Sequence, residues 1–124
     1  MTTTRFTDDH EWIRLEQDGI AVVGITDHAQ NELGDIVHVD LPAVDQSLAQ
    51  GEEAVVIESV KAAGEVRSPV AGTVVEVNET VADDPAKVNE APDSDGWLYR
   101  MRVDDAEDLD ALLDEPGYRQ LIGA

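Results

Sequence analysis

The sequence predicts a mainly β fold, a flattened β-barrel or β-sandwich that ends in short helices. Short runs of β-branched residues alternate with clusters of glycine, proline, asparagine and aspartate, a pattern typical of such folds. Only 4% of the residues are aromatic, so valine and other small β-branched side chains must fill the core. The segment 105–122 instead carries leucines at helical spacing after an acidic start, which favours helices.

The first predicted element pair is a hairpin. A polar start at Thr7 passes into an alternating strand that ends at Glu16, and Ile20–Ile25 is the return strand. Gln17-Asp18-Gly19 has the composition of the turn between them.

A short helix near 27–33 and a third strand follow. Thr26 or Asp27 can cap the free N–H groups of the helix, and Gly34 suits the left-handed residue that ends it. The strand runs from Asp35 to Leu41, and its alternation puts three apolar residues on one face, Val37, Val39 and Leu41.

The stretch Val55–Val77 is predicted to be the central hairpin. Two valine-rich runs flank a tip of small residues around Lys61, and Ser68–Gly72 is expected to open the return strand. After it, 81–90 is expected to be a loop with a helical turn near Pro85.

The last predicted strand, 97–103, alternates cleanly and turns four side chains inward, Trp97, Tyr99, Met101 and Val103. Asp104 or Asp105 is expected to cap a helix whose apolar stripe is Leu109, Leu112 and Leu113. Pro116 should break that helix, and a last short helix should follow. No linker rich in alanine, proline or serine interrupts the chain, so 1–124 is expected to be one domain, with a core of about 6–103 and a helical segment of about 105–122.

Composition excludes several functions. Eight basic and 28 acidic residues give a net charge of −20, which should repel nucleic acid and anionic membranes and favour basic clefts on partner proteins. No apolar run is long enough to span a membrane, and the N-terminus has no signal-peptide core. The absence of cysteine fits a cytoplasmic location. A monomer is the expected state.

Lys61 is the residue most suited to carry a function. It and Lys87 are the only two lysines, and its neighbours at the predicted tip are too small to crowd it. A long primary amine at a rigid turn is well placed for covalent modification. The plain alternative is a solvated surface cation, the usual state of lysine.

The chain lacks the patterns of common enzymes. No nucleophile–base set and no phosphate-binding loop is recognisable. Asp8-Asp9-His10-Glu11 has the chemistry of a metal site, but no second histidine stands at a defined spacing, so no metal is predicted. His10, His28 and His38 are interpreted as surface or strand residues.

The frame around the lysine, Glu58-Ser59-Val60-Lys61-Ala62, resembles the attachment hairpin of lipoyl and biotinyl carrier domains. Biotin carriers usually place methionine on each side of the lysine, whereas Val60 and Ala62 are typical of the H-protein family of the glycine cleavage system. The resemblance covers about Phe6 to Leu121 through further segments in the same order: Asp9–Trp12, Gly24–Gln30, Leu33–Val37, Val74–Asn78, Val88–Glu90 and Asp95–Trp97.

The resemblance implies a barrel-sandwich hybrid fold and a lipoyl group (lipoate) in amide linkage to Lys61. In the family, a pyridoxal-phosphate glycine decarboxylase transfers an aminomethyl group to the arm. A tetrahydrofolate-dependent aminomethyltransferase then removes the carbon, and dihydrolipoamide dehydrogenase reoxidises the dithiol. The implied protein is a carrier rather than an enzyme.

The resemblance also implies roles for residues near the arm. Glu58 and Gly72 match positions that help a lipoate-attaching enzyme recognise the hairpin; the alternatives are an exposed strand acid and a turn glycine. Glu11, Glu32 and Glu65 fall on segments expected to line a cleft for the loaded arm, and the alternative for all three is a solvated surface acid. Gly64, where the family often has serine, and Asp93, where it often has an aromatic residue, depart from the pattern.

Other readings stay open at this point. The chain could be an H-like protein that relays lipoate to other enzymes, a biotinyl or lipoyl module of another complex, or an unmodified β-domain that serves as an interaction module.

Overall fold

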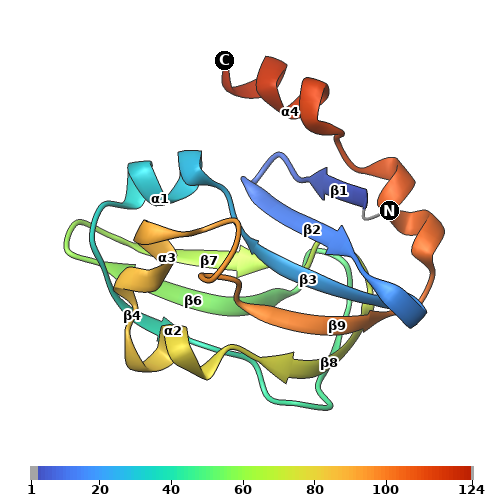
Figure 1. The fold of residues 1–124 in the computed structure, drawn as a ribbon, viewed down its shortest axis with the longest axis horizontal. Coiled ribbons are helices and arrows are strands. Elements are labelled where there is room, and N and C mark those ends of the chain that lie inside the picture. The colour runs from blue at the N-terminus through green and yellow to red at the C-terminus, as the bar shows by residue number, and fades with distance from the viewer. Residues whose placement is uncertain (1–2, 124) are drawn as a thin grey trace.

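The computed structural model describes residues 3–123, and its strands form two antiparallel sheets (Figure 1). The six-stranded sheet has the order β1 (Thr3–Phe6), β2 (Glu11–Leu15), β3 (Ile20–Ile25), β9 (Tyr99–Val103), β8 (Gly72–Val77), β5 (Ser47–Leu48). The three-stranded sheet has the order β4 (Ile36–Asp40), β6 (Glu53–Ser59), β7 (Ala63–Arg67). Within residues 3–123 neither sheet closes into a barrel.

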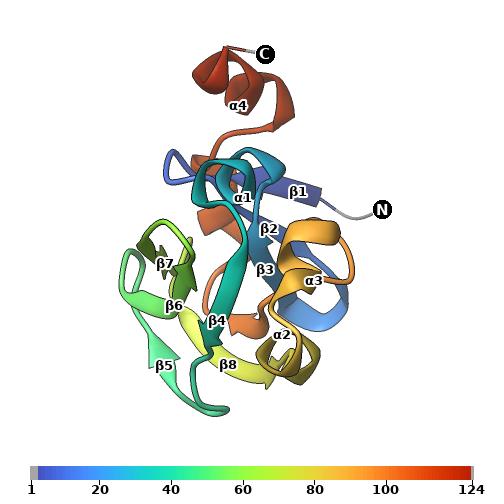
Figure 2. The same cartoon turned by 90° about the vertical axis from the view of Figure 1, so that its left-hand side faces the viewer.

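Short helices join and flank the sheets. They are the 3₁₀ turn η1 (Gln17–Gly19), α1 (Asp27–Leu33), α2 (Glu79–Asp83), α3 (Ala86–Glu90), the 3₁₀ helix η2 (Ala106–Ala111) and α4 (Glu115–Ile122). Figure 2 looks at the end of the molecule where the three-stranded sheet lies. In this view α1 lies above that sheet, and α4 lies above α1 at the top.

The core lies between the sheets and is built mainly of valine, isoleucine and leucine, as the low aromatic content predicts. The largest buried side chain, Trp12, covers Gly24 on the paired strand and donates a 3.0 Å hydrogen bond from Nε1 to the carbonyl of Pro92. A Cβ at Gly24 would lie 2.7 Å from the Trp12 ring, so only glycine fits beneath it.

The predicted fold class is confirmed: the protein is mostly β, with two sheets and a few short helices. The helix expected near 27–33 is α1, and Thr26 is its cap, because the Thr26 side chain accepts a hydrogen bond from the Ala29 N–H. Gly34 ends it at φ +81°, a conformation that favours glycine.

The predicted faces of the 35–41 strand are wrong. Ile36 and Val39 are buried, whereas Val37 is 55% exposed. The register of β4 against β6 shifts between Ile36 and His38, which is a β-bulge. An extra residue there breaks the alternation of side chains, and the sequence pattern had no signal for it.

The return strand of the central hairpin also differs from the prediction. The partner of β6 is β7, which ends at Arg67, and Ser68–Ala71 carries the chain from the small sheet to β8 in the large one. The two valine-rich runs of the sequence therefore lie in different sheets, with β7 between them in the chain.

Helices differ from expectation in two places. The segment expected to be a loop with one helical turn forms two helices, α2 and α3, and the side chain of Asn78 caps α2. Asp105 caps a 3₁₀ helix, η2, and Pro116 stands in the first turn of α4 instead of breaking a helix. Proline suits that position because the first turn has free N–H groups in any case.

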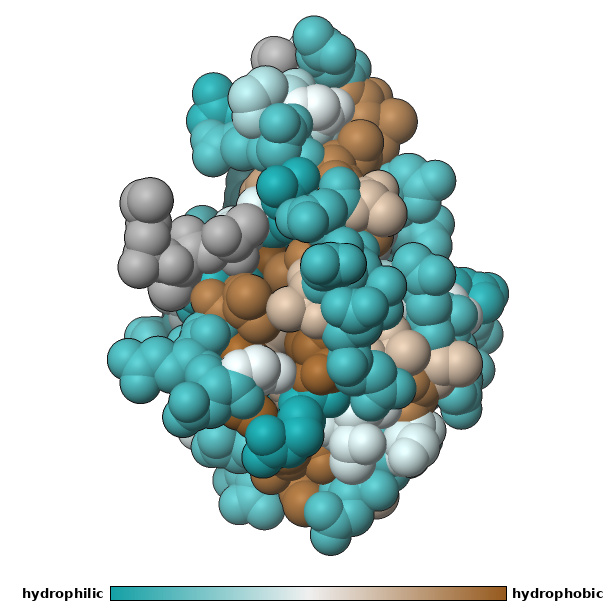
Figure 3. Space-filling view, turned by 90° about the vertical axis from the view of Figure 1, so that its right-hand side faces the viewer, coloured by the Kyte–Doolittle hydropathy of each residue, from teal (hydrophilic) through white to brown (hydrophobic). Residues whose placement is uncertain are grey.

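Hydrophilic side chains cover most of the face in Figure 3, and apolar atoms reach the surface in patches between them, one at the end where α4 lies. No helix among residues 3–123 has both the length and the apolar character to cross a lipid bilayer.

Candidate functional site

Lys61 lies at the exposed tip of the β6–β7 hairpin, next to Val60, which is 68% exposed. None of the ion pairs found within residues 3–123 involves Lys61. Its aliphatic stem rests on Gly34, since a Cβ at Gly34 would come within 2.8 Å of the Lys61 Cε. The amine therefore stands at the surface without a charged partner, accessible to an acylating enzyme.

Ser59 holds the tip in shape. Its backbone N–H donates to the carbonyl of Ala62 at 2.8 Å, and its hydroxyl accepts hydrogen bonds from the N–H groups of Lys61 and Ala62 at 3.2 and 3.0 Å. The hydroxyl also donates to the carbonyl of Ala62 at 3.0 Å. These bonds leave the tip little freedom, so the position of the Lys61 Cα is well defined.

The tip is also tied to the corner between α1 and β4. The N–H of Val60 donates to the carbonyl of Asp35 at 3.0 Å. Asn89 of α3 fixes that corner, because its Nδ2 donates to the Gly34 carbonyl at 2.9 Å and its Oδ1 accepts from the Ile36 N–H at 2.9 Å. Lys61 thus stands on a rigid support that joins three segments of the chain.

A cleft of about 300 Å³ begins beside this support, between α1 and β7. Leu33, which precedes Gly34, and Gly64 of β7 form the side nearest the tip. Three glutamates from distant parts of the sequence meet along its walls, Glu11, Glu32 and Glu65, together with Asp9 and His10. The cleft therefore has a strongly negative lining, which suits a group with a positive charge.

Glu11 is the buried member of this lining, only 2% exposed. Its Oε2 accepts a 2.6 Å hydrogen bond from the Arg67 N–H, and its Oε1 accepts one from the Thr7 hydroxyl at 3.0 Å. Burial raises the pKa of Glu11 from 4.5 to about 7, although both hydrogen bonds act against the shift, and the charge of Asp9 adds to it. The solvated-surface alternative is wrong for Glu11, whereas Glu32 and Glu65 are exposed.

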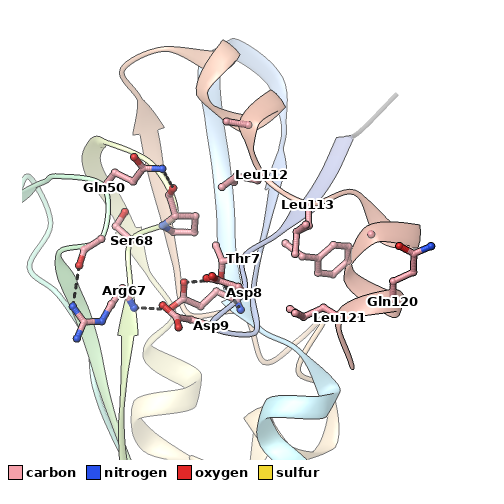
Figure 4. Close-up of a pocket in the computed structure, with 16 residues that line it drawn as sticks. Thr7, Asp8, Asp9, Gln50, Arg67, Ser68, Leu112, Leu113, Gln120 and Leu121 are labelled. Atoms are coloured by element: carbon pink, nitrogen blue, oxygen red, sulfur yellow. Dashed lines mark hydrogen bonds between the residues drawn. The ribbon is translucent and has the colours of Figure 1, made fainter. Parts of the chain in front are cut away.

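A second cavity, of about 680 Å³, also has Glu11 in its lining. Gln50, Arg67 and Ser68 stand on one side of it, and leucines of the C-terminal segment stand on the other (Figure 4). Glu11 and its neighbour Asp9 therefore line both cavities.

The two residues expected to guide modification lie in different settings. Glu58 is exposed on β6, opposite Ala63, and lies close to the tip. Gly72 is buried in the large sheet, between Leu48 of β5 and Val103 of β9. A Cβ there would lie 2.4 Å from the Arg102 carbonyl oxygen, so Gly72 has a packing reason to be glycine. A role for either residue in recognition stays a prediction.

Known proteins resemble this chain over nearly its whole length. The model of the family described as Glycine cleavage H-protein matches residues 4–124. The chain belongs to the glycine cleavage H-protein family. It is 51% identical to the glycine cleavage system H protein of Parvibaculum lavamentivorans over 122 residues, covering 98% of this chain and 97% of that protein. It is also 51% identical to that of Acidiphilium cryptum, with 98% of each chain covered.

The fold agrees with this membership. The crystal structure of a glycine cleavage system H protein from Mycobacterium marinum matches with a TM-score of 0.91 and 35% sequence identity over 98% of both chains. This confirms the resemblance that the sequence segments indicated.

Sequence reasoning gave no role in the site to three residues that the structure places there. Ser59 and Asn89 lie inside recognised segments; the Ser59 bonds are local to the turn, whereas the Asn89 bond to Gly34 is a tertiary contact. Asp9 lies in another such segment, and the only role considered for it was that of a metal ligand, whereas the structure puts it in the cleft. Polar residues at turns commonly bond to backbone, which is the one signal that could have singled out Ser59.

Proposed function

We propose that this chain is the lipoyl carrier of a glycine cleavage system, with the cofactor attached through an amide to Lys61. The observation that carries the proposal is the exposed amine of Lys61, which forms none of the ion pairs found within residues 3–123 and stands at a braced hairpin tip in a chain of this family. When bound, the lipoyl group supplies the disulfide exchange and carries the aminomethyl group, chemistry that no side chain here can perform because cysteine is absent.

The residues around Lys61 fit such a group. Lysine and lipoyl chain together make an arm on the order of 10–15 Å long. Ser59 and the Asn89-braced corner fix where the arm starts, and the cleft between Leu33 and Gly64 gives it a path along α1. The cleft is also lined by Glu11, Glu32 and Glu65, whose carboxyl groups suit the ammonium of a loaded arm. Enclosure in the cleft keeps water from a labile group.

The proposed partners follow from that role. They are glycine decarboxylase, aminomethyltransferase, dihydrolipoamide dehydrogenase and a lipoate-attaching enzyme. A carrier that visits several enzymes needs its arm at an exposed tip and works as a single domain and a monomer. Its surface charge of −20 favours weak docking on basic clefts, which is fast and reversible.

Intact-mass measurement tests the attachment, and the chain offers a matched control because it has only two lysines. Protein from the native host, or protein treated with a lipoate-attaching enzyme, should carry one lipoyl increment. Lys61→Arg should abolish the increment and Lys87→Arg should retain it, while both variants keep the unfolding temperature of the wild type. A biotinyl increment, or none in any form, would reject lipoylation.

A glycine–bicarbonate exchange assay with glycine decarboxylase tests the carrier role separately. The lipoylated protein should support exchange, and the Lys61→Arg variant should not. A protein that accepts lipoate but supports no exchange would instead be a relay of lipoate to other enzymes.

A further inference from the structure

His10, His28 and Glu32 form a cluster that the sequence did not predict. One ligand atom from each lies within 4.8 Å of the other two. His28 and Glu32 are one turn apart on α1, with Nε2 and Oε1 3.1 Å from each other, and His10 reaches them from the loop before β2. The two imidazole rings have centroids 4.5 Å apart and planes tilted by 42°. The spacing argument against a metal fails here because the second histidine comes from a different element.

We propose that these three side chains bind one divalent transition metal ion of the zinc type. Two imidazole nitrogens and a carboxylate are a common donor set for Zn²⁺, Co²⁺ and Ni²⁺, whereas Mg²⁺ and Ca²⁺ prefer oxygen alone. Two ligands on one tetrahedral Zn²⁺ lie about 3.4 Å apart, close to the present His28–Glu32 separation. Only His10 must move closer to the other two ligand atoms.

A second layer of hydrogen bonds already orients His10. Its Nδ1 lies 2.9 Å from the hydroxyl of Tyr118, which lies 2.7 Å from the hydroxyl of Thr26. Tyr118 and Thr26 are 5% and 6% exposed, so the bond between their hydroxyl groups is buried, whereas the bond to His10 is part-buried. An ion on Nε2 leaves the Nδ1–H to donate to Tyr118, the arrangement usual for metal-bound histidine.

The surroundings of the cluster are negatively charged, which favours a cation, and its ligand residues are accessible from solvent. Asp9 and Asp27 are exposed neighbours in the chain of His10 and His28, and the whole molecule carries −20 charges. Glu32 is 66% exposed at its side chain, and His28 is 32% exposed. His10 and Glu32 also line the cleft, so a bound ion competes with a cationic group there.

Calorimetric titration of the full-length, tag-free chain with Zn²⁺ tests the proposal, together with the visible absorption of bound Co²⁺. We expect one equivalent of saturable binding that excess Mg²⁺ does not displace, and a Co²⁺ spectrum typical of nitrogen ligands. His10→Ala, His28→Ala and Glu32→Gln should each weaken binding at least about tenfold. His38→Ala is the matched control, since His38 is exposed on β4 in the three-stranded sheet and is not one of the proposed ligands. This variant should bind Zn²⁺ like the wild type.

Tyr118→Phe tests whether the Tyr118 hydroxyl orients His10 for the metal ion, in a variant that should still fold. The variant keeps the ring that stacks on Phe6 but loses the hydroxyl that holds His10. It should weaken Zn²⁺ binding about tenfold. Each variant's unfolding temperature without metal shows whether it folds. Folded variants that bind Zn²⁺ as tightly as His38→Ala, or a wild type without saturable binding, would overturn the proposal.

Discussion

At the scale of single residues, Glu11 has an unusual environment for a carboxyl group, because it is buried. The side chain is buried beside two cavities and accepts hydrogen bonds from a backbone N–H and a hydroxyl. Because its pKa in the folded protein is about 7 and its ordinary value is 4.5, the folded state binds this proton more tightly than the unfolded state. The contribution of Glu11 to stability is full below pH 4.5 and is lost as the pH rises through 7.

We therefore expect Glu11→Gln to be more stable than the wild type at pH 8 by about 1–3 kcal/mol, with the gain vanishing near pH 4. The amide is isosteric, and it can accept from Arg67 and donate to Thr7. Denaturant unfolding of both proteins gives the free energy of unfolding at each pH. Subtracting the wild-type value from the variant value cancels the pH dependence of the groups that both proteins share.

Glu65→Gln is the control for this series, because Glu65 lines the same cleft but is exposed. It should shift stability by less than about 0.5 kcal/mol at any pH. A Glu11→Gln difference that is the same at pH 4 and pH 8 would contradict the raised pKa.

The site could be predicted from the sequence only in part. The Glu58–Ala62 frame predicted Lys61 as the attachment site, and the family resemblance placed three glutamates near a cleft, which the structure brings together. The burial of Glu11 could not be predicted, because a glutamate in a polar stretch is usually solvated. The meeting of His10 with His28 depends on how the loop before β2 packs on α1, a long-range contact without a local pattern.

At the scale of elements, Gly72 shows how a strand can require glycine without a turn. Its φ is not positive, and the restriction comes from the Arg102 carbonyl and the Met101 methyl group, 2.4 and 2.6 Å from an added Cβ. The opposing atoms belong to a paired backbone and a buried side chain, so neither can move without disturbing the contact between β8 and β9.

We expect Gly72→Ala to destabilise the fold by about 2–4 kcal/mol, because the added Cβ overpacks the contact between β8 and β9. Gly64→Ala is the matched control in the other sheet, since its Cβ would meet only Leu33, at 3.4 Å. Thermal or denaturant unfolding measures both. If Gly72→Ala folds as stably as the wild type yet is poorly lipoylated, the residue acts in recognition rather than in packing.

The ends of a helix could be predicted where the capping residues stand next to the helix in the sequence. Thr26 and Gly34 bound α1 as predicted. The β4 bulge and the change of sheet at Ser68–Ala71 depend on contacts between distant segments. Propensity and alternation describe a segment alone, so they could not locate these features.

At the scale of the whole molecule, the charge of −20 acts against compactness. Seven ion pairs, one of them involving histidine, are formed within residues 3–123. They leave most of the 28 acidic residues without a cationic partner. Like charges at this density repel one another, and dissolved salt screens that repulsion.

We expect the unfolding temperature at pH 7 to rise by several degrees between 10 mM and 500 mM NaCl, since about 1 kcal/mol corresponds to about 4 °C at this size. The effect should shrink as the pH approaches the isoelectric point of about 4.1, where the repulsion disappears. Differential scanning calorimetry measures it. An unfolding temperature at pH 7 that does not change with salt would show that the repulsion is already balanced within the fold.

Glu11 lines two cavities, and this affects how its proton can exchange with solvent. If the proposed lipoyl arm lies in the 300 Å³ cleft, it covers one approach to Glu11. Glu11 also lines the 680 Å³ cavity, which shares neither Leu33 nor Gly64 with the cleft and so lies outside the proposed path of the arm. The carboxyl group would then keep a second approach from solvent, so an arm in the cleft would not by itself trap its proton.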